Sequence, residues 1–224
     1  MSKSVVIAVD GTAASGKGTL AKRLAAHFGF AHLDSGALYR LTALAVLQAG
    51  GDPADPADAV RGAQTIDLSL AGDLAIRTDK VGQAASQVAA IGAVRQALLD
   101  FQRGFLASPP GGSPGAVMDG RDIGTVISPD ATAKLYVDAR PELRAHRRWL
   151  ELKGMGIERD EQGLLAELNA RDAADKSRPI SPLVQAPDAV LLDTSDLSID
   201  AAFAAALALV SPRIEGALKD RHRG

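Results

Sequence analysis

Cysteine is absent from this chain of 224 residues. Its absence excludes a disulfide framework, a thiolate metal site and a cysteine nucleophile, and it is compatible with a reducing compartment. A surplus of positive charge is absent as well, because 25 Lys and Arg residues and 27 Asp and Glu residues leave a net charge of −2. A nucleic-acid platform would draw its affinity from phosphate neutralisation, so this balance argues against nucleic acid as a partner.

Membrane and metal signals are also lacking. The start, Met1-Ser2-Lys3-Ser4, has no apolar stretch of the kind found in signal peptides, and no run approaches the length needed to cross a bilayer. Neither a zinc site nor a Ser-His-Asp triad is supported by the spacing of the histidines, which are His27, His32, His146 and His222. We expect a cytoplasmic monomer with no membrane partner.

Short apolar runs alternate with longer helical patterns along the chain. This alternation predicts an α/β fold with a parallel sheet covered by helices on both faces. The expected strands are residues 5–10, 31–34, 116–119, 134–138 and 189–193. Each run ends in an aspartate, and ligands bind at the carboxyl ends of the strands in open α/β sheets. The length suits one domain, 1–224, with insertions.

A phosphate-binding pattern follows the first expected strand. It consists of Gly11, Thr12, Ala13, Ala14, Ser15, Gly16, Lys17, Gly18 and Thr19, and a helix-like stretch follows at 20–28. The glycines let the backbone turn so that N–H groups and the positive end of the helix point at phosphates. Lys17 adds a charge near the β and γ phosphates, and Thr19 offers a hydroxyl to the shell of Mg²⁺. The pattern predicts a Walker A site for a nucleoside triphosphate; the alternative is a Gly/Ala-rich turn that happens to hold a lysine.

The middle of the chain departs from the alternating pattern. Between residues 50 and 91 the apolar periodicity weakens, and two short runs at 67–70 and 74–77 flank the turn-like residues 71–73. This pattern predicts a small hairpin within an inserted subdomain, followed by a helix over 91–107 that returns to the core.

Many arginines lie near the ends of the expected strands, in the insertion or in the polar stretch 171–178. Two substrates that both carry phosphates would need such a set. The guanidinium group binds phosphate oxygens with a planar fork of donors and keeps its charge at any working pH. The candidates are Arg40, Arg77, Arg95, Arg121, Arg144, Arg147, Arg148, Arg171 and Arg178. For any one of them a solvated helix face is the alternative, above all for Arg144, Arg147 and Arg148, which share a polar helix with Glu142 and Glu151.

Several motifs follow the phosphate loop in a fixed order. They are Leu33-Asp34-Ser35-Gly36-Ala37-Leu38-Tyr39-Arg40, Ala85-Ser86-Gln87-Val88-Ala89, Val94-Arg95, Asp119-Gly120-Arg121-Asp122-Ile123-Gly124-Thr125-Val126 and Arg171-Asp172-Ala173-Ala174-Asp175-Lys176-Ser177-Arg178. In this order the motifs resemble those of bacterial cytidylate kinase, over nearly the whole chain. The resemblance implies a nucleoside monophosphate kinase fold with a five-stranded parallel sheet. It also implies an insertion that binds the monophosphate, at about 51–93, and a mobile lid at about 154–182.

The resemblance further implies the transfer of a phosphoryl group from ATP, with Mg²⁺, to CMP or dCMP in pyrimidine nucleotide metabolism. It assigns the ATP phosphates to residues 11–19. The acceptor phosphate is assigned to Ser35, Arg40, Arg121 and Arg178, the cytosine to Ser86, Arg95 and Asp122, and the sugar to Arg171 and Asp175. Lys17, Arg121, Arg171 and Arg178 are the candidates for catalysis, and Thr19 is the candidate metal ligand. The insertion is shorter than the family pattern suggests, which leaves open how fully it encloses the nucleotide.

Alternatives remain open at this point. Asp122 could instead cap a turn, and Ser86 could be a small residue inside a helix. Asp34 and Asp119 could hold water bound to magnesium or position arginines. For the whole chain, a P-loop kinase acting on UMP, AMP or an alcohol such as shikimate would share residues 11–19. Two hypotheses lie outside the kinases. The chain could be a regulatory protein that binds a nucleotide without turnover, or a purely structural α/β protein.

Overall fold

The computed structural model describes residues 4–223. The chain divides into two compact units, one of residues 1–33 and 106–224 and one of residues 34–105. The expectation that no signal peptide is present concerns Met1 to Lys3, which lie outside the described residues.

A five-stranded sheet forms the centre of the first unit, with the strand order β2-β3-β1-β4-β5. The strands are β1 (Val5–Gly11), β2 (Ala31–Asp34), β3 (Gly115–Gly120), β4 (Ala133–Asp138) and β5 (Val190–Asp193). Strand β1 pairs in parallel with β3 and with β4, and β4 pairs in parallel with β5. The predicted parallel α/β sheet is thus confirmed, and each expected strand lies within one residue of its observed bounds.

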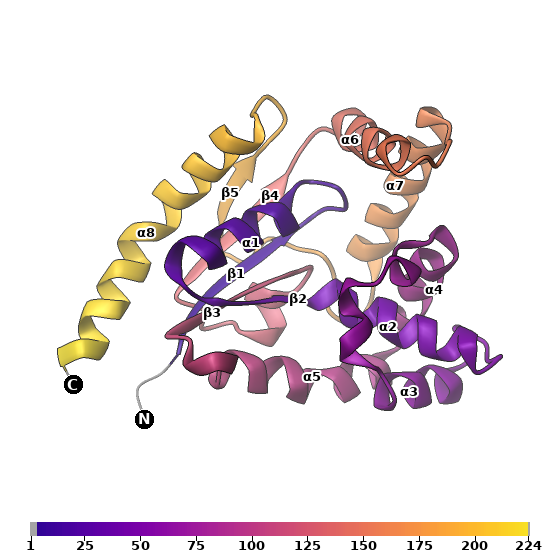
Figure 1. The fold of residues 1–224 in the computed structure, drawn as a ribbon, viewed down its shortest axis with the longest axis horizontal. Helices are drawn as coiled ribbons and strands as arrows, with labels where there is room; N and C mark the ends of the chain where they lie inside the picture. The colour runs from indigo at the N-terminus through magenta and orange to yellow at the C-terminus, as the bar shows by residue number, and fades with distance from the viewer. Residues whose placement is uncertain (1–3, 224) are drawn as a thin grey trace. The chain divides into compact units, whose positions relative to one another are not determined.

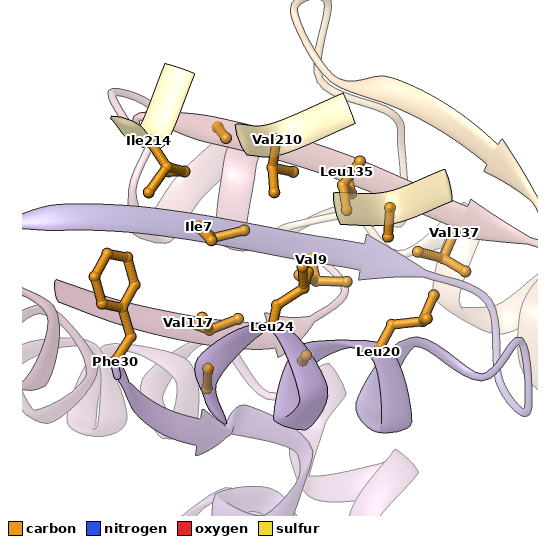
Figure 2. Packing of buried hydrophobic residues seen from close by; sticks show 14 of the residues in the cluster. Ile7, Val9, Leu20, Leu24, Phe30, Val117, Leu135, Val137, Val210 and Ile214 are labelled. Carbon is orange, nitrogen blue, oxygen red and sulfur yellow. The ribbon is translucent and has the colours of Figure 1, made fainter. Parts of the chain in front are cut away.

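Two helices cover one face of this sheet, α1 (Lys17–Phe28) and α8 (Ile199–Arg223). Alternate residues of a strand point to the same face, and Ile7, Val9 and Val137 accordingly pack with Leu24 of α1 and Val210 of α8 (Figure 2). All five are almost fully shielded from solvent. The core therefore sits between the strands and these two helices and fixes the position of the loop that joins β1 to α1.

Helix α8 differs from the sequence expectation. Its segment Ile199–Arg221 is long enough to cross a membrane, and an 18-residue window within it is apolar enough, at a mean hydropathy of 1.4. The expectation that no run approaches that length is therefore wrong on these two criteria. In the structure Ala202, Ala206, Val210 and Ile214 recur every four residues and are buried in the core. Through these four residues the helix packs against the sheet.

The remaining elements of the first unit lie in the segments that connect the strands (Figure 1). They are the π-helical turn η4 (Ile123–Ile127), α6 (Pro141–Gly154), α7 (Glu161–Ser177) and a short 3₁₀ turn, η3 (Pro110–Gly112). Pro141 occupies the first turn of α6, and the carboxylate of Asp160 caps α7 by accepting the Gly163 amide proton at 2.7 Å. Helices α6 and α7 pack against each other.

The second unit is helical. It contains α2 (Ser35–Gln48), α3 (Pro56–Gln64), η1 (Leu68–Gly72), η2 (Leu74–Arg77) and α4 (Asp79–Ala90), and most of α5 (Gly92–Ala107). Helix α2 packs against both α3 and α4. The close approach of α3 depends on Gly62, since a Cβ there would lie 2.5 Å from the Val46 side chain and 2.9 Å from the Thr42 carbonyl oxygen.

The hairpin predicted at 67–77 is wrong, because the structure has two 3₁₀ turns there. Asp67 accepts the amide proton of Ser69 at 2.9 Å, and Asp73 accepts that of Ala75 at 2.7 Å. Aspartates that bind the backbone two residues ahead favour turns over a strand ladder. The local side chains thus override the weak alternation of Leu68, Leu70, Leu74 and Ile76.

Candidate functional site

The phosphate loop lies between β1 and α1, and two of its glycines are required by geometry. A Cβ at Gly11 would stand 1.9 Å from the carbonyl oxygen of Val137 on the neighbouring strand. Gly16 immediately precedes α1 with φ of 88°, a left-handed conformation that favours glycine. These constraints place the predicted Walker A residues in a tight turn at the carboxyl end of β1.

The start of α1 is built to receive negative charge. No side chain caps the helix at Gly16, and the first turn carries no acidic residue. The first amides of a helix have no partner within it, and together with the helix dipole they attract phosphate. The hydroxyl of Ser15 in the same loop is buried without a hydrogen-bond partner. Such an atom fits a loop that binds an oxyanion, since buried polar atoms are normally satisfied.

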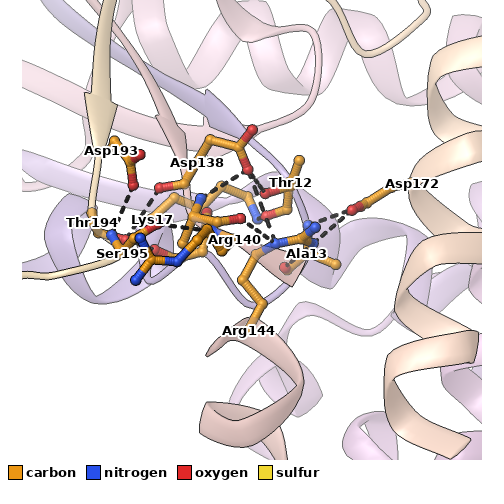
Figure 3. Close-up of polar contacts among 12 residues, drawn as sticks. Thr12, Ala13, Lys17, Asp138, Arg140, Arg144, Asp172, Asp193, Thr194 and Ser195 are labelled. Carbon is orange, nitrogen blue, oxygen red and sulfur yellow. Dashed lines mark hydrogen bonds and ion pairs between the residues drawn. The ribbon is translucent and has the colours of Figure 1, made fainter. Parts of the chain in front are cut away.

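Three hydrogen bonds hold the loop, two through its carbonyl groups and one through the Thr12 hydroxyl (Figure 3). Lys17 Nζ donates to the Thr12 carbonyl oxygen at 3.1 Å. The Thr12 hydroxyl donates to Asp138 Oδ1 at 2.6 Å, at the end of β4. The hydroxyl of Thr194, just after β5, donates to the Ser15 carbonyl oxygen at 3.0 Å. These contacts leave the loop preorganised, with Asp138 and Thr194 in supporting roles that the sequence did not suggest.

A buried ion pair holds the middle of the loop. Arg144 Nη1 donates to Asp172 Oδ2 at 2.6 Å and to the Ala13 carbonyl oxygen at 3.0 Å. Asp172 Oδ1 in turn accepts the Ala13 amide proton at 3.3 Å. Figure 3 shows the two side chains meeting at Ala13 from helices α6 and α7. Both backbone groups of Ala13 are therefore bound by one ion pair.

The donors around Thr19 fit a metal that arrives with a nucleotide. Among the residues that the structure describes, no group of three or more His, Cys, Asp or Glu side chains could hold a metal ion. Mg²⁺ usually takes one or two protein oxygens and fills its shell with phosphates and water. Thr19 lies in the first turn of α1, and Asp119 Oδ2 lies 3.4 Å from the Cβ position of Gly18. His32 Nε2 lies 2.8 Å from Asp119 Oδ1, which fixes that carboxylate.

A second cluster of charges joins α7 to the end of β3. Arg121 Nε donates to Asp175 Oδ2 at 2.8 Å, and Arg178 Nη1 lies 3.7 Å from Asp175 Oδ1. Burial alone would raise the pKa of the Asp175 carboxyl, but Arg121, followed by Arg178 and Arg171, lowers it below its ordinary value. The structure thus brings together Arg121 and Arg178, which are predicted to bind the acceptor phosphate, and Asp175, which is predicted to bind the sugar.

Asp122 follows Arg121 and immediately precedes η4. The residue is 4% exposed, and its side chain makes no capping bond to the turn. The neighbouring amides of Ile123 and Gly124 are instead bound by Asp10, whose two carboxylate oxygens accept them at 2.8 and 2.7 Å. The side chain that binds the first amides of η4 is therefore that of Asp10 and not that of Asp122.

In the second unit, Ser35 and Arg40 belong to α2. Arg40 Nη2 donates to Asp34 Oδ2 at 2.6 Å, and Asp34 Oδ1 caps α2 by accepting the Ala37 amide proton at 3.1 Å. Arg40 Nε is buried without a hydrogen-bond partner. Asp34 could have held water bound to magnesium or positioned an arginine, and these contacts match the second role.

The predicted cytosine residues of this unit lie on α4 and α5. Arg95 is buried, donates to the Ala89 carbonyl oxygen at 3.2 Å, and places its guanidinium carbon 5.2 Å from the centre of the Tyr39 ring. The Ser86 hydroxyl donates to the Gly82 carbonyl oxygen at 3.3 Å, a bond within its own helix. Arg95 is therefore held in a defined orientation, whereas the Ser86 contact is one that a helical serine commonly makes.

Comparisons with known proteins decide the family. The family described as Cytidylate kinase matches residues 7–211, which is most of the chain. The chain belongs to the cytidylate kinase family. A protein named Cytidylate kinase from Rhodopseudomonas palustris (strain TIE-1) is 54% identical over 206 residues, 92% of this chain and 95% of that protein. Another of that name, from Bradyrhizobium diazoefficiens, is 51% identical over 220 residues, 98% of this chain and 100% of that protein. The resemblance read from the motifs is confirmed.

A solved structure bears on the fold alone. An uncharacterized protein from Eubacterium ventriosum ATCC 27560 superposes with a TM-score of 0.51 at 13% sequence identity, covering 92% of this chain and 98% of that one. At this identity the likeness supports the arrangement of strands and helices and says nothing about the reaction.

Arg144 supports the phosphate loop, although the sequence analysis could not tell it apart from an arginine on a solvated helix face. It is 3% exposed, whereas Arg148 on the same helix makes a surface pair with Glu151. A signal was available, since Arg144 lies eight residues before the buried Leu152 and thus on the same helix face. An arginine on the apolar face of a helix indicates a buried anion partner, and here that partner is Asp172.

Asp10 gives a prediction on pH and stability. Burial, opposed by the bonds from Gly124 and Ile123, raises the pKa of its carboxyl from 3.8 to about 6. The folded state then binds the proton more tightly than the unfolded state, so this group destabilises the fold progressively as pH rises from 4 to 6. We expect Asp10→Asn to remove that term. Its free energy of unfolding relative to the wild type should rise by up to about 3 kcal/mol between pH 4 and pH 7.

Urea unfolding of both proteins at a series of pH values measures this difference. A constant offset between the two curves is expected from the changed hydrogen bonds to η4 and does not bear on the prediction. Parallel curves over the whole range would show that the buried carboxyl titrates normally.

Proposed function

We propose that this protein transfers the γ-phosphoryl group of ATP to CMP or dCMP, giving CDP or dCDP and ADP. The observation that carries the proposal is the match to the cytidylate kinase family over residues 7–211. The phosphate loop supports it, because Gly11 and Gly16 adopt the geometry that the loop requires. The chain is a nucleotide-binding kinase, a phosphotransferase with a phosphate group as acceptor.

On the donor side, the amides of residues 11–19 and the dipole of α1 would hold the phosphates. Lys17 bridges the loop through Thr12 and is positioned to add its charge to the same oxyanion. Charge builds up on the transferred group and on the leaving oxygens during phosphoryl transfer, so fixed positive charge lowers the barrier. The loop contacts from Asp138 and Thr194 would keep this arrangement in place before the substrate binds.

A divalent metal accompanies the nucleotide in such a kinase, and we propose Mg²⁺. Thr19 would provide its hydroxyl, and Asp119, fixed by His32, would accept hydrogen bonds from water around the metal. When bound, the metal neutralises charge on the β and γ phosphates.

On the acceptor side, a phosphate monoester has its second pKa near 6 and is largely a dianion at neutral pH. It needs no protein base to act as a nucleophile, so catalysis reduces to positioning and charge stabilisation. We assign four residues to the acceptor phosphate. Ser35 and Arg40 belong to the second unit, and Arg121 and Arg178 belong to the first. Arg171 and Asp175 are assigned to the sugar. Arg121, Arg171 and Arg178 would also stabilise charge on the transferred group.

For the base, we assign Arg95, Asp122 and Ser86. Cytosine presents its 4-amino group as a donor, which a carboxylate accepts, while its O2 and N3 accept from a guanidinium. Uracil presents an oxygen at position 4. An ionised Asp122 would then face an acceptor without a hydrogen between them, and such unpaired buried groups cost about 1 to 3 kcal/mol.

Asp122→Ala should therefore erode the preference for CMP over UMP. We expect the ratio of kcat/KM values for the two substrates to fall by about 5- to 150-fold, the equivalent of the lost discrimination. Steady-state assays with CMP and UMP measure it, with the exposed Asp220→Ala as the matched control. An unchanged ratio would remove Asp122 from base recognition.

A panel of acceptors tests the whole proposal. ADP formation from Mg-ATP is followed with CMP, dCMP, UMP, AMP, GMP and shikimate offered separately, and without acceptor. Strong turnover with CMP and dCMP and weak turnover with UMP are expected. Turnover with a different acceptor would leave the fold intact and refute the substrate assignment. Nucleotide binding without acceptor-dependent ADP release would indicate a regulatory protein instead.

We further propose a single kinase domain in which residues 51–93 form the monophosphate-binding insertion and residues 154–182 act as a lid. Closure of the lid over bound nucleotides would exclude water that could otherwise hydrolyse ATP. The balanced charge and the core-packed face of α8 support a cytoplasmic monomer without nucleic-acid or membrane partners.

A further inference from the structure

The phosphate loop and helix α7 are joined at one residue, Ala13. Its carbonyl oxygen accepts from Arg144 Nη1 at 3.0 Å, and its amide donates to Asp172 Oδ1 at 3.3 Å. Arg144 and Asp172 are bound to each other at 2.6 Å. The other loop contacts described above use carbonyl groups or side chains, so Asp172 is the carboxylate that takes up a loop amide. Any movement of Ala13 must therefore move the ion pair or break it.

The pair is too deeply buried to be an incidental surface contact. The side chains of Arg144 and Asp172 are 4% and 8% exposed. A buried ion pair persists only where further hydrogen bonds satisfy the remaining polar atoms. Arg144 meets this condition, because its Nε also donates to the Ala139 carbonyl oxygen at 2.8 Å, between β4 and α6. The guanidinium thus ties the loop, the start of α6 and helix α7 into one network.

Helix α7 carries this network towards the acceptor residues. Asp172 and Asp175 are three residues apart and lie on the same side of the helix. Asp172 binds the phosphate loop, and Asp175 binds Arg121 at 2.8 Å. One helical turn therefore separates a contact with the donor loop from a contact with an arginine assigned to the acceptor phosphate.

We propose that the Arg144–Asp172 pair couples the two nucleotide sites, so that a triphosphate bound at residues 11–19 strengthens the binding of the monophosphate. The proposal rests on the proposed function. In it, Arg144 and Asp172 are positioning residues that act through Ala13 and through helix α7. Phosphates bound to the loop amides would restrain Ala13 further, and through the ion pair they would restrain α7. The monophosphate would then meet a smaller ordering cost when it binds second.

Calorimetry measures this coupling without turnover. The dissociation constant of CMP is determined alone and with a saturating Mg²⁺ complex of the β,γ-imido analogue of ATP, and the ratio of the two is the coupling factor. We expect a factor of about 5 or more in the wild type. Asp172→Asn keeps the shape of the side chain and removes its charge, and we expect its coupling factor to fall towards one. The factor is a ratio of two CMP dissociation constants of the same variant, so a change in basal affinity does not affect it.

Glu167→Gln is the matched control, because Glu167 lies on the same helix and pairs at the surface with Arg159. It should keep the wild-type factor. If Asp172→Asn fails to fold, the double variant Arg144→Met/Asp172→Leu replaces the pair by apolar side chains and leaves no lone buried charge. A wild-type factor of one, an Asp172→Asn factor equal to that of the wild type, or an equal fall in Glu167→Gln overturns the coupling. Absence of CMP binding in any state would refute the proposed function itself.

Discussion

Lys17→Ala is expected to reduce kcat for phosphoryl transfer by about 10²- to 10³-fold, the usual cost of removing one fixed donor to a developing oxyanion. The ammonium group donates to the Thr12 carbonyl oxygen at 3.1 Å, so it spans the phosphate loop. Removing it withdraws a charge that would act on the β and γ phosphates and also loosens the loop. Steady-state rates of ADP formation with saturating ATP and CMP measure the effect on kcat.

The same helix offers a matched control, since Lys22 is exposed two helical positions beyond the first turn of α1. Lys22→Ala changes the net charge and the helix composition in the same way, and it should retain the wild-type rate. A fall confined to the KM for ATP, with kcat unchanged, would mean that Lys17 binds ground state and transition state equally and has no catalytic role.

The strands and the phosphate loop could be predicted from sequence because both are governed by local patterns. Fully buried parallel strands leave continuous apolar runs such as Val5-Val6-Ile7-Ala8-Val9. The loop is governed by backbone sterics, and the Cβ position of Gly11 against Val137 shows why another residue is excluded there. Residue type and order reflect such constraints, so the strands and the loop can be predicted without knowledge of the tertiary structure.

The support of the loop could not be predicted, because it depends on partners distant in sequence. Ala13 is bound by Arg144 and Asp172, which lie 131 and 159 residues further along the chain. Helix periodicity places Arg144 on the apolar face of α6, but no local pattern shows which distant groups it binds. The hairpin predicted at 67–77 is wrong for the opposite reason. Asp67 and Asp73 bind backbone amides two residues ahead and so favour turns, although the weak apolar alternation suggested strands.

Arg121→Met is expected to lower kcat/KM for CMP by about 10²- to 10³-fold, because the variant loses a charge assigned to the acceptor phosphate. It should also change stability through Asp175. The pKa of that carboxyl is held below its ordinary value chiefly by Arg121, against the effect of burial. A carboxyl with a depressed pKa stabilises the fold above its unfolded pKa, and this contribution is lost as pH falls through the folded pKa. Without Arg121, the contribution at neutral pH should shrink by about 1 to 3 kcal/mol.

Urea unfolding at pH 7 and near pH 4 tests the sign, since the deficit of Arg121→Met relative to the wild type should be smaller at the acid end. The exposed Arg213→Met serves as the control for loss of one positive charge. The double variant Arg121→Met/Asp175→Leu separates the two roles, because it removes the buried carboxylate along with its partner. It should regain stability without regaining affinity for CMP. If Arg121→Met bound CMP as tightly as the wild type, Arg121 would serve only to hold Asp175 on helix α7, and the acceptor phosphate would have to rely on Arg40 and Arg178.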